Sequence, residues 1–435
     1  MRAIMRRGLS TAMAAVLAGG LAVACGGDGG EEGGSDGGPV ELTVDVFGEP
    51  GYDALYKQYE RSHPNVTIKQ RKVSSLDEYK PRIQQWMATG SGAGDVVMLE
   101  EGILPLYMQQ RTKFVDLFDH GGKALEQNFL PWKWQMGVSA DGEQLVGLGT
   151  DVGPLAMCYR KDLFEKAGLP TERDDVGKLW PTWDAFLTTG QKFQHEVPGS
   201  KWLDGPTAVF RATVLQNAGG GPGHSFFDKD DELVFDSNPA VRQAFDTSLK
   251  FAQGKLTADM SIFTPPWQTA LKRDTFATVP CPSWMLGGIE EFSGAAGKGK
   301  WDVATTPGGS GYWGGSWLAV PKQTKHAKAA AELAKFLTSP EGQVGAFKEA
   351  NVFPSSPQAA QNPAVAGAKS AYFSDAPIGQ NFGRLVAAVK PVYLGPKNED
   401  VRAAVENVLI SVGQGEQKPE DAWSKSVGEA EKAAR

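Results

Sequence analysis

Three acidic side chains that lie beside predicted strands are the residues of this chain best suited to chemistry. Glu100 and Glu101 follow a short apolar strand at 95–99, and Asp151 precedes another at 155–159. Glycoside hydrolysis requires two carboxyl groups on opposite sides of a scissile bond. Two adjacent glutamates on one loop do not by themselves meet that requirement, and no other catalytic spacing is present. We therefore expect a protein that is not an enzyme, with a secreted glycoside hydrolase as the weaker alternative.

Other catalytic and metal-binding patterns find little support in the sequence. The five histidines are scattered without a metal-ligand spacing, so neither a metal nor a cofactor is expected. The run GAAGKGK at 294–300 has the glycine and lysine spacing of a phosphate loop. However, Trp301 stands where serine or threonine must bind magnesium, and no strand precedes the run. We interpret it as a surface loop.

The elements that must position the acidic residues alternate between strand and helix. The runs 42–47, 66–73 and 95–99 have the pattern of strands, and 52–62 and 76–89 have the apolar spacing of helices. This order predicts an α/β fold with a mainly parallel sheet covered on both faces. Ligands bind beyond the carboxyl ends of such strands, which here carry Phe47, Glu49, Glu100 and Glu101.

The N-terminus has the organisation of an export signal. Arg2, Arg6 and Arg7 precede the apolar stretch 9–24, which ends at Cys25 and a glycine-rich acidic run. This arrangement resembles the lipobox and tether of bacterial lipoproteins, although Ala22 stands where that pattern usually has leucine. It predicts a signal peptide at 1–24, lipidation of Cys25, and a flexible tether at 25–39. Ordinary secretion and a short uncleaved anchor are the alternatives.

The chain after residue 24 is acidic and too long for one hydrophobic core. It has 41 basic and 51 acidic residues, a formal charge of −10, which argues against binding to nucleic acid or to an anionic lipid surface. A single core usually stops growing at ~250–300 residues, so two domains are expected. No second stretch reaches the ~20 apolar residues that a membrane helix needs, so membrane contact would be through the lipid anchor only.

Seven motifs in a fixed order resemble the extracellular solute-binding proteins of carbohydrate ABC importers, the family that includes maltose-binding protein. They are GEPG at 48–51, DVV at 95–97, YRKDLFEKAGLP at 159–170, PTWDAF at 181–186, GGSWLAVPK at 314–322, the helix from 329 into FLTSPE at 336–341, and VFPS at 352–355. The resemblance implies the two-lobed fold of type II periplasmic binding proteins, each lobe a mixed, mainly parallel sheet flanked by helices. By analogy the lobes are 40–150 plus 307–354 and 151–306 plus 355–435, joined at a hinge.

The resemblance also implies the function and the partners. The protein would act as a monomer outside the cell, capture an oligosaccharide by hinge closure, and deliver it to the permease subunits and ATPase of an importer. Acidic loops with many aromatic residues favour a neutral sugar of two to four units. The resemblance to the family makes cello-, xylo- and chito-oligosaccharides plausible, with a preference for β-linked glucans such as cello-oligosaccharides. A glycerophosphodiester or a polyamine is the alternative solute within the same class.

Sugar-binding sites combine flat aromatic surfaces with groups that exchange hydrogen bonds with hydroxyls. Trp284 ends the run VPCPSW at 279–284, which resembles the family segment whose tryptophan stacks on sugar. At the position where maltose-binding protein has a ligand-contacting acid, this chain has Gly153, which argues against a copied maltose site. The expected ligand-binding residues are Trp284, Trp313, Tyr312, Trp267, Phe47, Glu49, Glu100, Glu101, Asp151, Asn381 and Arg384, with Gln380 beside the last two.

Two cysteines remain after Cys25 is assigned to the anchor. Cys158 and Cys281 would lie in an extracytoplasmic compartment, which permits a disulfide. Two buried free thiols, which behave as small apolar groups, are the alternative. The sequence leaves both possibilities open.

Overall fold

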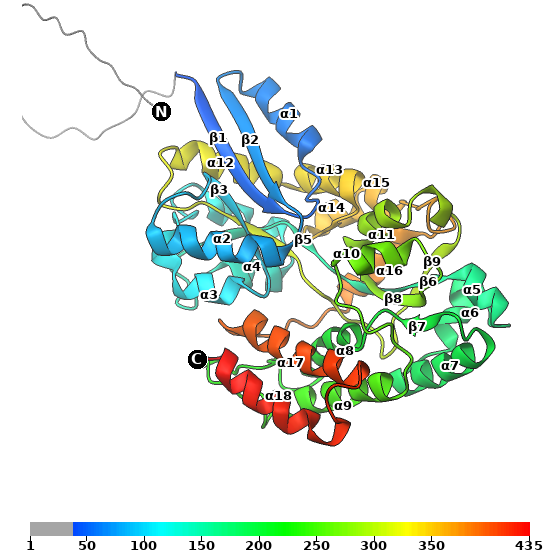
Figure 1. Cartoon of the computed structure of the whole chain (residues 1–435). Coiled ribbons are helices and arrows are strands. Elements are labelled where there is room, and N and C mark those ends of the chain that lie inside the picture. Colours follow the sequence, from blue (N-terminus) through cyan, green and yellow to red (C-terminus); the bar gives the residue numbers. More distant parts are fainter. Residues whose placement is uncertain (1–37) are drawn as a thin grey trace, which may run out of the picture. The chain divides into compact units, whose positions relative to one another are not determined.

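Two separate β-sheets organise the described part of the chain. A computed structural model of the protein describes residues 38–435, so the expected signal peptide, Cys25 and nearly all of the tether lie outside the described residues. One sheet has five strands and the other has four, and a third pairing joins two short strands. Figure 1 shows the elements in sequence colours, with helices around both sheets.

The five-stranded sheet has the order β2-β1-β3-β10-β4. The strands β2, β1 and β3 are parallel, whereas β10 runs antiparallel to both β3 and β4. The strands are β1 (Val40–Phe47), β2 (Val66–Val73), β3 (Val96–Glu100), β4 (Gly147–Gly149) and β10 (Ser316–Ala319). The strand β10 comes from far along the sequence, so this sheet is built from two separate parts of the chain.

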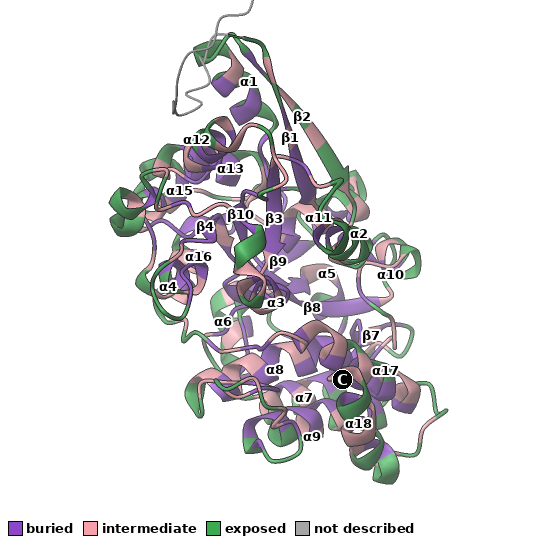
Figure 2. Ribbon diagram, turned by 90° about the vertical axis from the view of Figure 1, so that its left-hand side faces the viewer, coloured by how far each residue is buried: buried purple, intermediate pink, exposed green. Residues whose placement is uncertain are grey.

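Alternating side chains along β3 divide the surroundings of this sheet into two cores. Val96 and Met98 pack with helices α1 (Asp53–Ser62) and α12 (Ala327–Leu337) on one face. Val97 and Leu99 pack with α2 (Leu76–Thr89) and α3 (Leu104–Gln109) on the other. This period of two is what a strand buried on both faces requires, and Figure 2 shows β3 as buried.

The four-stranded sheet has the order β7-β8-β6-β9. It consists of β6 (Leu155–Arg160), β7 (Lys201–Leu203), β8 (Phe276–Pro282) and β9 (Trp301–Thr305). Cys158 on β6 and Cys281 on β8 are joined by a disulfide across these paired strands. Both cysteines are fully buried.

The prediction of mainly parallel sheets is wrong for this second sheet. The central strand β6 is antiparallel to both β8 and β9, and only β7 and β8 are parallel. Strand patterns in a sequence carry no direction, and the direction is decided by how the chain enters each sheet. Here the chain enters the second sheet at the inner strand β6. It later returns to the first sheet as β10, which runs antiparallel to β3 and β4. The prediction of mixed α/β sheets flanked by helices is confirmed.

Short strands join the two sheets. β5 (Asp151–Val152) pairs with β11 (Phe353–Pro354) in antiparallel fashion. The buried Gln343 on α13 (Pro340–Ala350) holds this region together, because its Nε2 donates to the Thr338 carbonyl at 2.8 Å and its Oε1 accepts from the Ser356 amide at 2.9 Å. The joining strands are therefore fixed by backbone and side-chain hydrogen bonds.

Four helices form a layer beyond the second sheet. They are α8 (Pro206–Gly220), α9 (Pro239–Gln253), α17 (Asn398–Gly413) and α18 (Pro419–Ala433), and they share one apolar core. Within residues 38–435 no helix is both long and apolar enough to cross a membrane. The remaining helices are α4 (Pro131–Gly137), α5 (Lys161–Lys166), α6 (Arg173–Lys178), α7 (Trp183–Glu196), α10 (Pro265–Leu271), α11 (Met285–Ser293), α14 (Pro357–Gln361), α15 (Pro363–Ala366), α16 (Ile378–Ala387), and the 3-10 turns η1 (Arg111–Lys113), η2 (Gly122–Asn128) and η3 (Ala295–Gly297).

Candidate ligand-binding site

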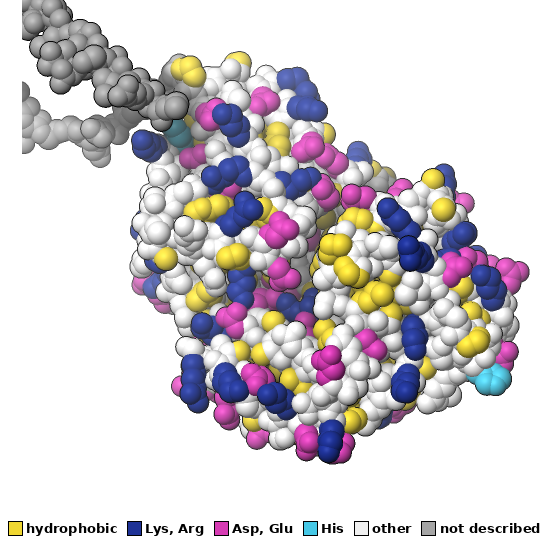
Figure 3. All heavy atoms as spheres, viewed as in Figure 1, with side chains coloured by type: hydrophobic (Ala, Val, Ile, Leu, Met, Phe, Trp, Pro, Cys, Tyr) yellow, Lys and Arg dark blue, Asp and Glu magenta, His cyan; other side chains and the backbone are white. Residues whose placement is uncertain are grey.

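A cavity lies where the loops of the two sheets and the helical layer meet. The first sheet contributes the loops that follow β1, β2 and β3, so the carboxyl ends of its three parallel strands line the cavity. The second sheet contributes the end of β8, and the helices α8 and α17 contribute Arg211, Glu399 and Arg402. Figure 3 shows a hollow near the middle of this face, with hydrophobic side chains gathered on the side of α10 and α11.

One side of the cavity, here called the acidic wall, consists of Glu100, Glu101 and Asp151. Glu100 Oε2 accepts from the Gly102 amide at 2.6 Å, and Glu101 Oε2 accepts from the Gly314 amide at 3.2 Å. The other oxygen of Glu101, Oε1, is buried and has no hydrogen-bond partner within the described structure. Because this oxygen has neither water nor a donor beside it, ionising the carboxyl group is costly.

Burial changes the protonation of this wall. Burial raises the pKa of Glu101 to about 7, against the neighbouring Tyr312 hydroxyl, Lys133 and the Gly314 amide, which lower it. Burial, followed by the charges of Glu399 and Glu101, also raises the pKa of Glu100 well above its ordinary value. Both carboxyl groups therefore hold protons at a higher pH than a solvent-exposed glutamate would.

Lys133 supplies a buried positive charge behind the acidic wall. Burial lowers its pKa to about 8, although Asp151, Glu101 and Glu100 act in the opposite direction. Its Nζ lies 3.3 Å from the centre of the Trp317 ring, a cation–π contact. At neutral pH the lysine remains charged, so it partly compensates the negative charge of the wall.

Asp151 stands at the start of β5, where the chain passes from the first sheet to the second. Its Oδ1 accepts from Thr150 Oγ1 at 2.6 Å and from the Ser316 amide at 3.0 Å. These bonds fix the carboxylate between β5 and β10. Asp151 therefore faces the cavity and ties the joining strands at the same time.

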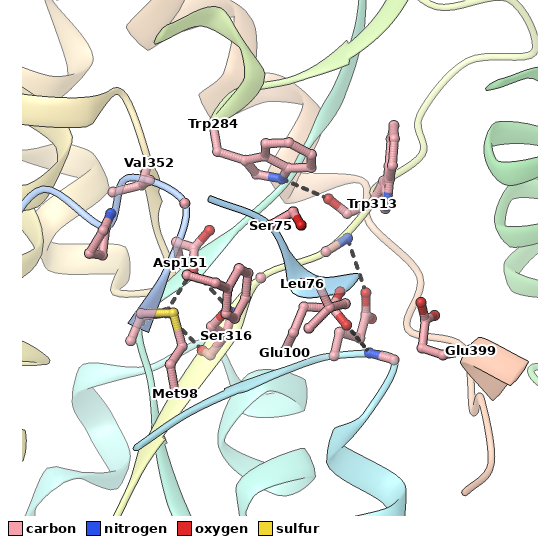
Figure 4. Close-up of a pocket in the computed structure, with 18 of the residues that line it drawn as sticks. Ser75, Leu76, Met98, Glu100, Asp151, Trp284, Trp313, Ser316, Val352 and Glu399 are labelled. Carbon is pink, nitrogen blue, oxygen red and sulfur yellow. Dashed lines mark hydrogen bonds between the residues drawn. The ribbon is translucent and has the colours of Figure 1, made fainter. Parts of the chain in front are cut away.

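The opposite side, here called the aromatic wall, consists of Phe263, Trp284 and Trp313. The rings of Trp284 and Trp313 meet edge to face, with centroids 5.4 Å apart, and the Trp284 indole N–H donates to the Trp313 carbonyl at 3.0 Å. Figure 4 shows this bond, with Glu100 on the other side of the pocket. All three rings are partly exposed, so apolar surface remains for a ligand.

Gly153 explains how the two tryptophans come so close to the joining strand. A Cβ atom at this position would lie 1.9 Å from the Trp313 carbonyl oxygen and 2.7 Å from the Trp284 indole nitrogen. No side chain fits there. The absence of an acid at this position is therefore a packing requirement of the aromatic wall.

Two arginines line the cavity, but other carboxylates already pair with them. Arg211 Nη2 donates to Glu406 at 2.6 Å, and Arg402 donates to Glu406 at 2.8 Å and also bonds to Glu399. Arg211 also lies over Trp313, with its guanidinium carbon 5.0 Å from the ring centre. Because their charges are already satisfied, these arginines offer little to an anionic ligand.

Several residues expected at the site lie outside the cavity. Trp267 lies on helix α10, which begins at Pro265. Its side chain is buried, and its indole N–H donates to Asp204 at 2.9 Å. Tyr312 is buried beside Glu101, and its hydroxyl accepts from the Val392 amide at 3.1 Å. The remaining three, Gln380, Asn381 and Arg384, lie on α16 and do not line the cavity.

The expected residues that do line the cavity are Phe47, Glu49, Glu100, Glu101, Asp151, Trp284 and Trp313. Glu49 is exposed at the rim, where it pairs with Lys72 at 2.5 Å. Sequence reasoning missed Phe263, Arg211, Asn398, Glu399 and Arg402. Their segments carry no motif, and their helices and loops reach the cavity only through tertiary packing.

The arrangement has the chemistry to hold a solute. In residues 38–435 no three His, Cys, Asp or Glu side chains are grouped so that they could hold a metal ion. Carboxylates on one wall accept hydrogen bonds, and flat rings on the other offer apolar contact. Two mixed sheets, joined by short strands and lining one cavity, define the two-lobed class of solute-binding proteins.

Comparison with known proteins supports this class. The family model for bacterial extracellular solute-binding proteins matches residues 54–372, and the chain belongs to this family. A crystal structure of an extracellular solute-binding protein of family 1 is 37% identical, covers 91% of this chain and 100% of its own, and has a TM-score of 0.81.

Two further relatives are less similar. The arabinooligosaccharide-binding protein of Bacillus subtilis (strain 168) is 24% identical over 342 residues, 70% of each chain. The binding protein of an ABC transporter of B. animalis subsp. lactis Bl-04, solved with β-1,6-galactobiose, is 22% identical, with 90% of this chain and 96% of that chain covered and a TM-score of 0.76. The latter shows a shared fold.

Proposed function

We propose that this protein is the solute receptor of an ABC importer and captures a neutral oligosaccharide in the cavity between the acidic and aromatic walls. The observation that carries the proposal is the division of the cavity itself. Sugar rings present C–H faces that pack on Trp284 and Trp313, and a rim of hydroxyls that donate to Glu100, Glu101 and Asp151. One relative is named as an arabinooligosaccharide-binding protein, and another was solved with β-1,6-galactobiose. Both agree with an oligosaccharide ligand.

We further propose that the ligand is β-linked and has two to four units, with cello-oligosaccharides among the first candidates. The lobes would be 40–150 plus 307–354 and 151–306 plus 355–435, with closure about the joining strands. Cys25 would carry the lipid anchor, and the protein would serve as a monomer for permease subunits and their ATPase.

A cationic solute such as a polyamine is the second candidate. The acidic wall favours it, because three carboxyl groups gather on one side of the cavity. Lys133 behind the wall opposes it, since a second positive charge would be repelled. A glycerophosphodiester is disfavoured, because Arg211 and Arg402 already pair with Glu399 and Glu406.

The test is a calorimetric titration of the purified chain with a panel of solutes. The panel contains cello-oligosaccharides, arabino-oligosaccharides, β-1,6-galactobiose, maltose, spermidine and glycerophosphocholine. We expect saturable binding, with a dissociation constant in the micromolar range, to one β-linked class of sugar that is recovered intact. Binding of spermidine alone would replace the proposal by the cationic alternative, and release of shorter sugars would show an enzyme.

A further inference from the structure

Phe263 lines the cavity in a backbone conformation that its residue type disfavours. In the segment 255–263, Lys255, Asp259 and Phe263 have φ angles of 53°, 52° and 63°. This left-handed region suits glycine, and a bulky side chain in it is unusual. Such conformations persist only where the surroundings hold them, and they are common at ligand clamps.

The hydrogen bonds that hold this segment do not require a phenylalanine. The Ala258 amide donates to the Leu203 carbonyl at 2.9 Å, and the Met260 amide donates to the Asp204 carbonyl at 3.2 Å. The Phe263 carbonyl accepts from Gln268 Nε2 at 3.3 Å. All three bonds use backbone atoms of the segment, so glycine at 263 would keep them. What phenylalanine adds is its ring.

The ring of Phe263 completes the aromatic wall. Its centroid lies 5.9 Å from that of Trp284 and 6.2 Å from that of Trp313. Behind it, Trp267 packs edge to face at 5.6 Å and is itself fixed to the buried Asp204. The ring is thus supported from the protein side and partly exposed on the cavity side.

We propose that Phe263 contacts the ligand and determines which saccharides fit the aromatic end of the cavity. The inference rests on the proposed function and names a residue for which the sequence holds no signal. The strained backbone and the Trp267 ring behind it keep the Phe263 ring from turning away. A short, unbranched sugar would pack its C–H face on this ring, and a longer or branched one would have to displace it.

Two variants of Phe263 and one control test this role. Phe263→Gly removes the ring and relieves the backbone strain, whereas Phe263→Leu keeps the strain and the apolar bulk but lacks a flat face. Lys255→Gly is the control, because it relieves the same kind of strain in the same segment at an exposed position outside the cavity. Each full-length variant is titrated with disaccharides and trisaccharides of the linkage that wild type binds.

We expect Phe263→Gly to bind the preferred disaccharide about tenfold more weakly, a loss of about 1.4 kcal/mol. Its preference should shift towards the trisaccharide, its melting temperature should change little, Phe263→Leu should be intermediate, and Lys255→Gly should bind as wild type does. Affinities within twofold of wild type in both Phe263 variants would overturn the inference, as would an equal loss in Lys255→Gly. If Phe263→Gly does not fold, Phe263→Leu decides. Absence of sugar binding by wild type would instead refute the proposed function, and this inference with it.

Discussion

The two walls of the cavity differ in chemistry and in the energy stored in the empty protein. The aromatic wall is three partly exposed rings that pack on one another, and it leaves no charge buried. The acidic wall has two glutamates with raised pKa values and one carboxylate oxygen that is buried without a partner in the described part of the chain. In the empty protein the aromatic wall therefore carries no cost of burying charge, whereas the acidic wall does.

The difference suggests that one wall provides affinity and the other provides selectivity. Apolar contact with rings is tolerant of hydroxyl arrangement, so the aromatic wall should contribute affinity for many sugars. Hydrogen bonds depend on geometry, so the acidic wall should select among them. Substitutions in each wall can separate these two roles.

Replacing Trp284 should have the largest effect on binding. Trp284→Ala removes the central ring of the aromatic wall and its bond to the Trp313 carbonyl. We expect an affinity loss of about 100-fold, or about 2.7 kcal/mol, for every sugar that wild type binds. Calorimetric titration of the variant measures it.

Trp423→Ala is the matched control for that experiment. Trp423 is also partly exposed, but it stacks on Phe235 in the helical layer and does not line the cavity. It should lower the melting temperature without changing the affinity. Unchanged sugar affinity in Trp284→Ala would contradict the role of the aromatic wall.

Glu101 should make the empty protein less stable as the pH rises. In the folded state burial raises its pKa to about 7, above the ordinary value of 4.5, so the folded protein binds more protons than the unfolded chain between these values. Its contribution to stability is therefore present below the ordinary pKa and is lost as the pH rises through about 7. We expect the free energy of unfolding of wild type to fall by about 2 kcal/mol more than that of Glu101→Gln between pH 5 and pH 7.

Urea unfolding of both proteins at the two pH values measures this difference. Glu100 has a pKa raised in the same direction, so Glu101→Gln should retain a smaller slope of the same sign. The titration of Lys133, with a pKa of about 8, lies above the window. Parallel pH profiles for wild type and Glu101→Gln would show that the acidic wall carries no such energetic cost.

Site residues that directly follow a strand could be predicted from the sequence. Site residues on distant segments, which only tertiary packing brings to the cavity, could not. Glu100 and Glu101 could be placed because the carboxyl ends of parallel strands meet at one edge. Phe263 and Glu399 could not, because only the docking of a loop and of α17 brings them there. Trp267 was misjudged because a Pro-Pro pair can begin a helix as well as stiffen a loop.

The strands and helices could likewise be predicted where their own residues determine them, but the strand directions could not. Burial patterns predicted β1, β2, β3 and α2 closely, since each is governed by its own residues. The direction of β6 and β10 depends on the path of the chain between the sheets, which local patterns do not contain.

Replacing Asp151 separates ligand binding from hinge structure. In Asp151→Asn the amide oxygen can still accept from Thr150 Oγ1 and the Ser316 amide, so the fold should persist. Loss of the charge should weaken sugar binding about tenfold, or about 1.4 kcal/mol, and more for some linkages than for others. Glu41→Gln, at an exposed position of β1 outside the cavity, should change the affinity little. An equal loss for every linkage would argue that Asp151 acts through the hinge alone.

The smallest effect is expected for the ion pair between Lys80 on α2 and Asp400 on α17. This pair links two helices that each contribute other residues to the cavity, and it is partly exposed, so it should contribute no more than about 1 kcal/mol. Lys80→Met should weaken binding two- to threefold at low salt and less at high salt, as measured by titration. Lys69→Met, which breaks a pair within the first sheet, should have no effect on affinity. A salt-independent loss of tenfold or more would mean that this ion pair, and not the two walls, determines the affinity.

The most direct test of the two-wall account is a crystal structure of the protein with the sugar that binds most tightly in the panel. We predict one sugar ring with its C–H face on Trp284 and Trp313 and with hydroxyls within hydrogen-bond distance of Glu100, Glu101 or Asp151. A sugar bound with its hydroxyls towards the aromatic wall, or bound outside this cavity, would contradict the account.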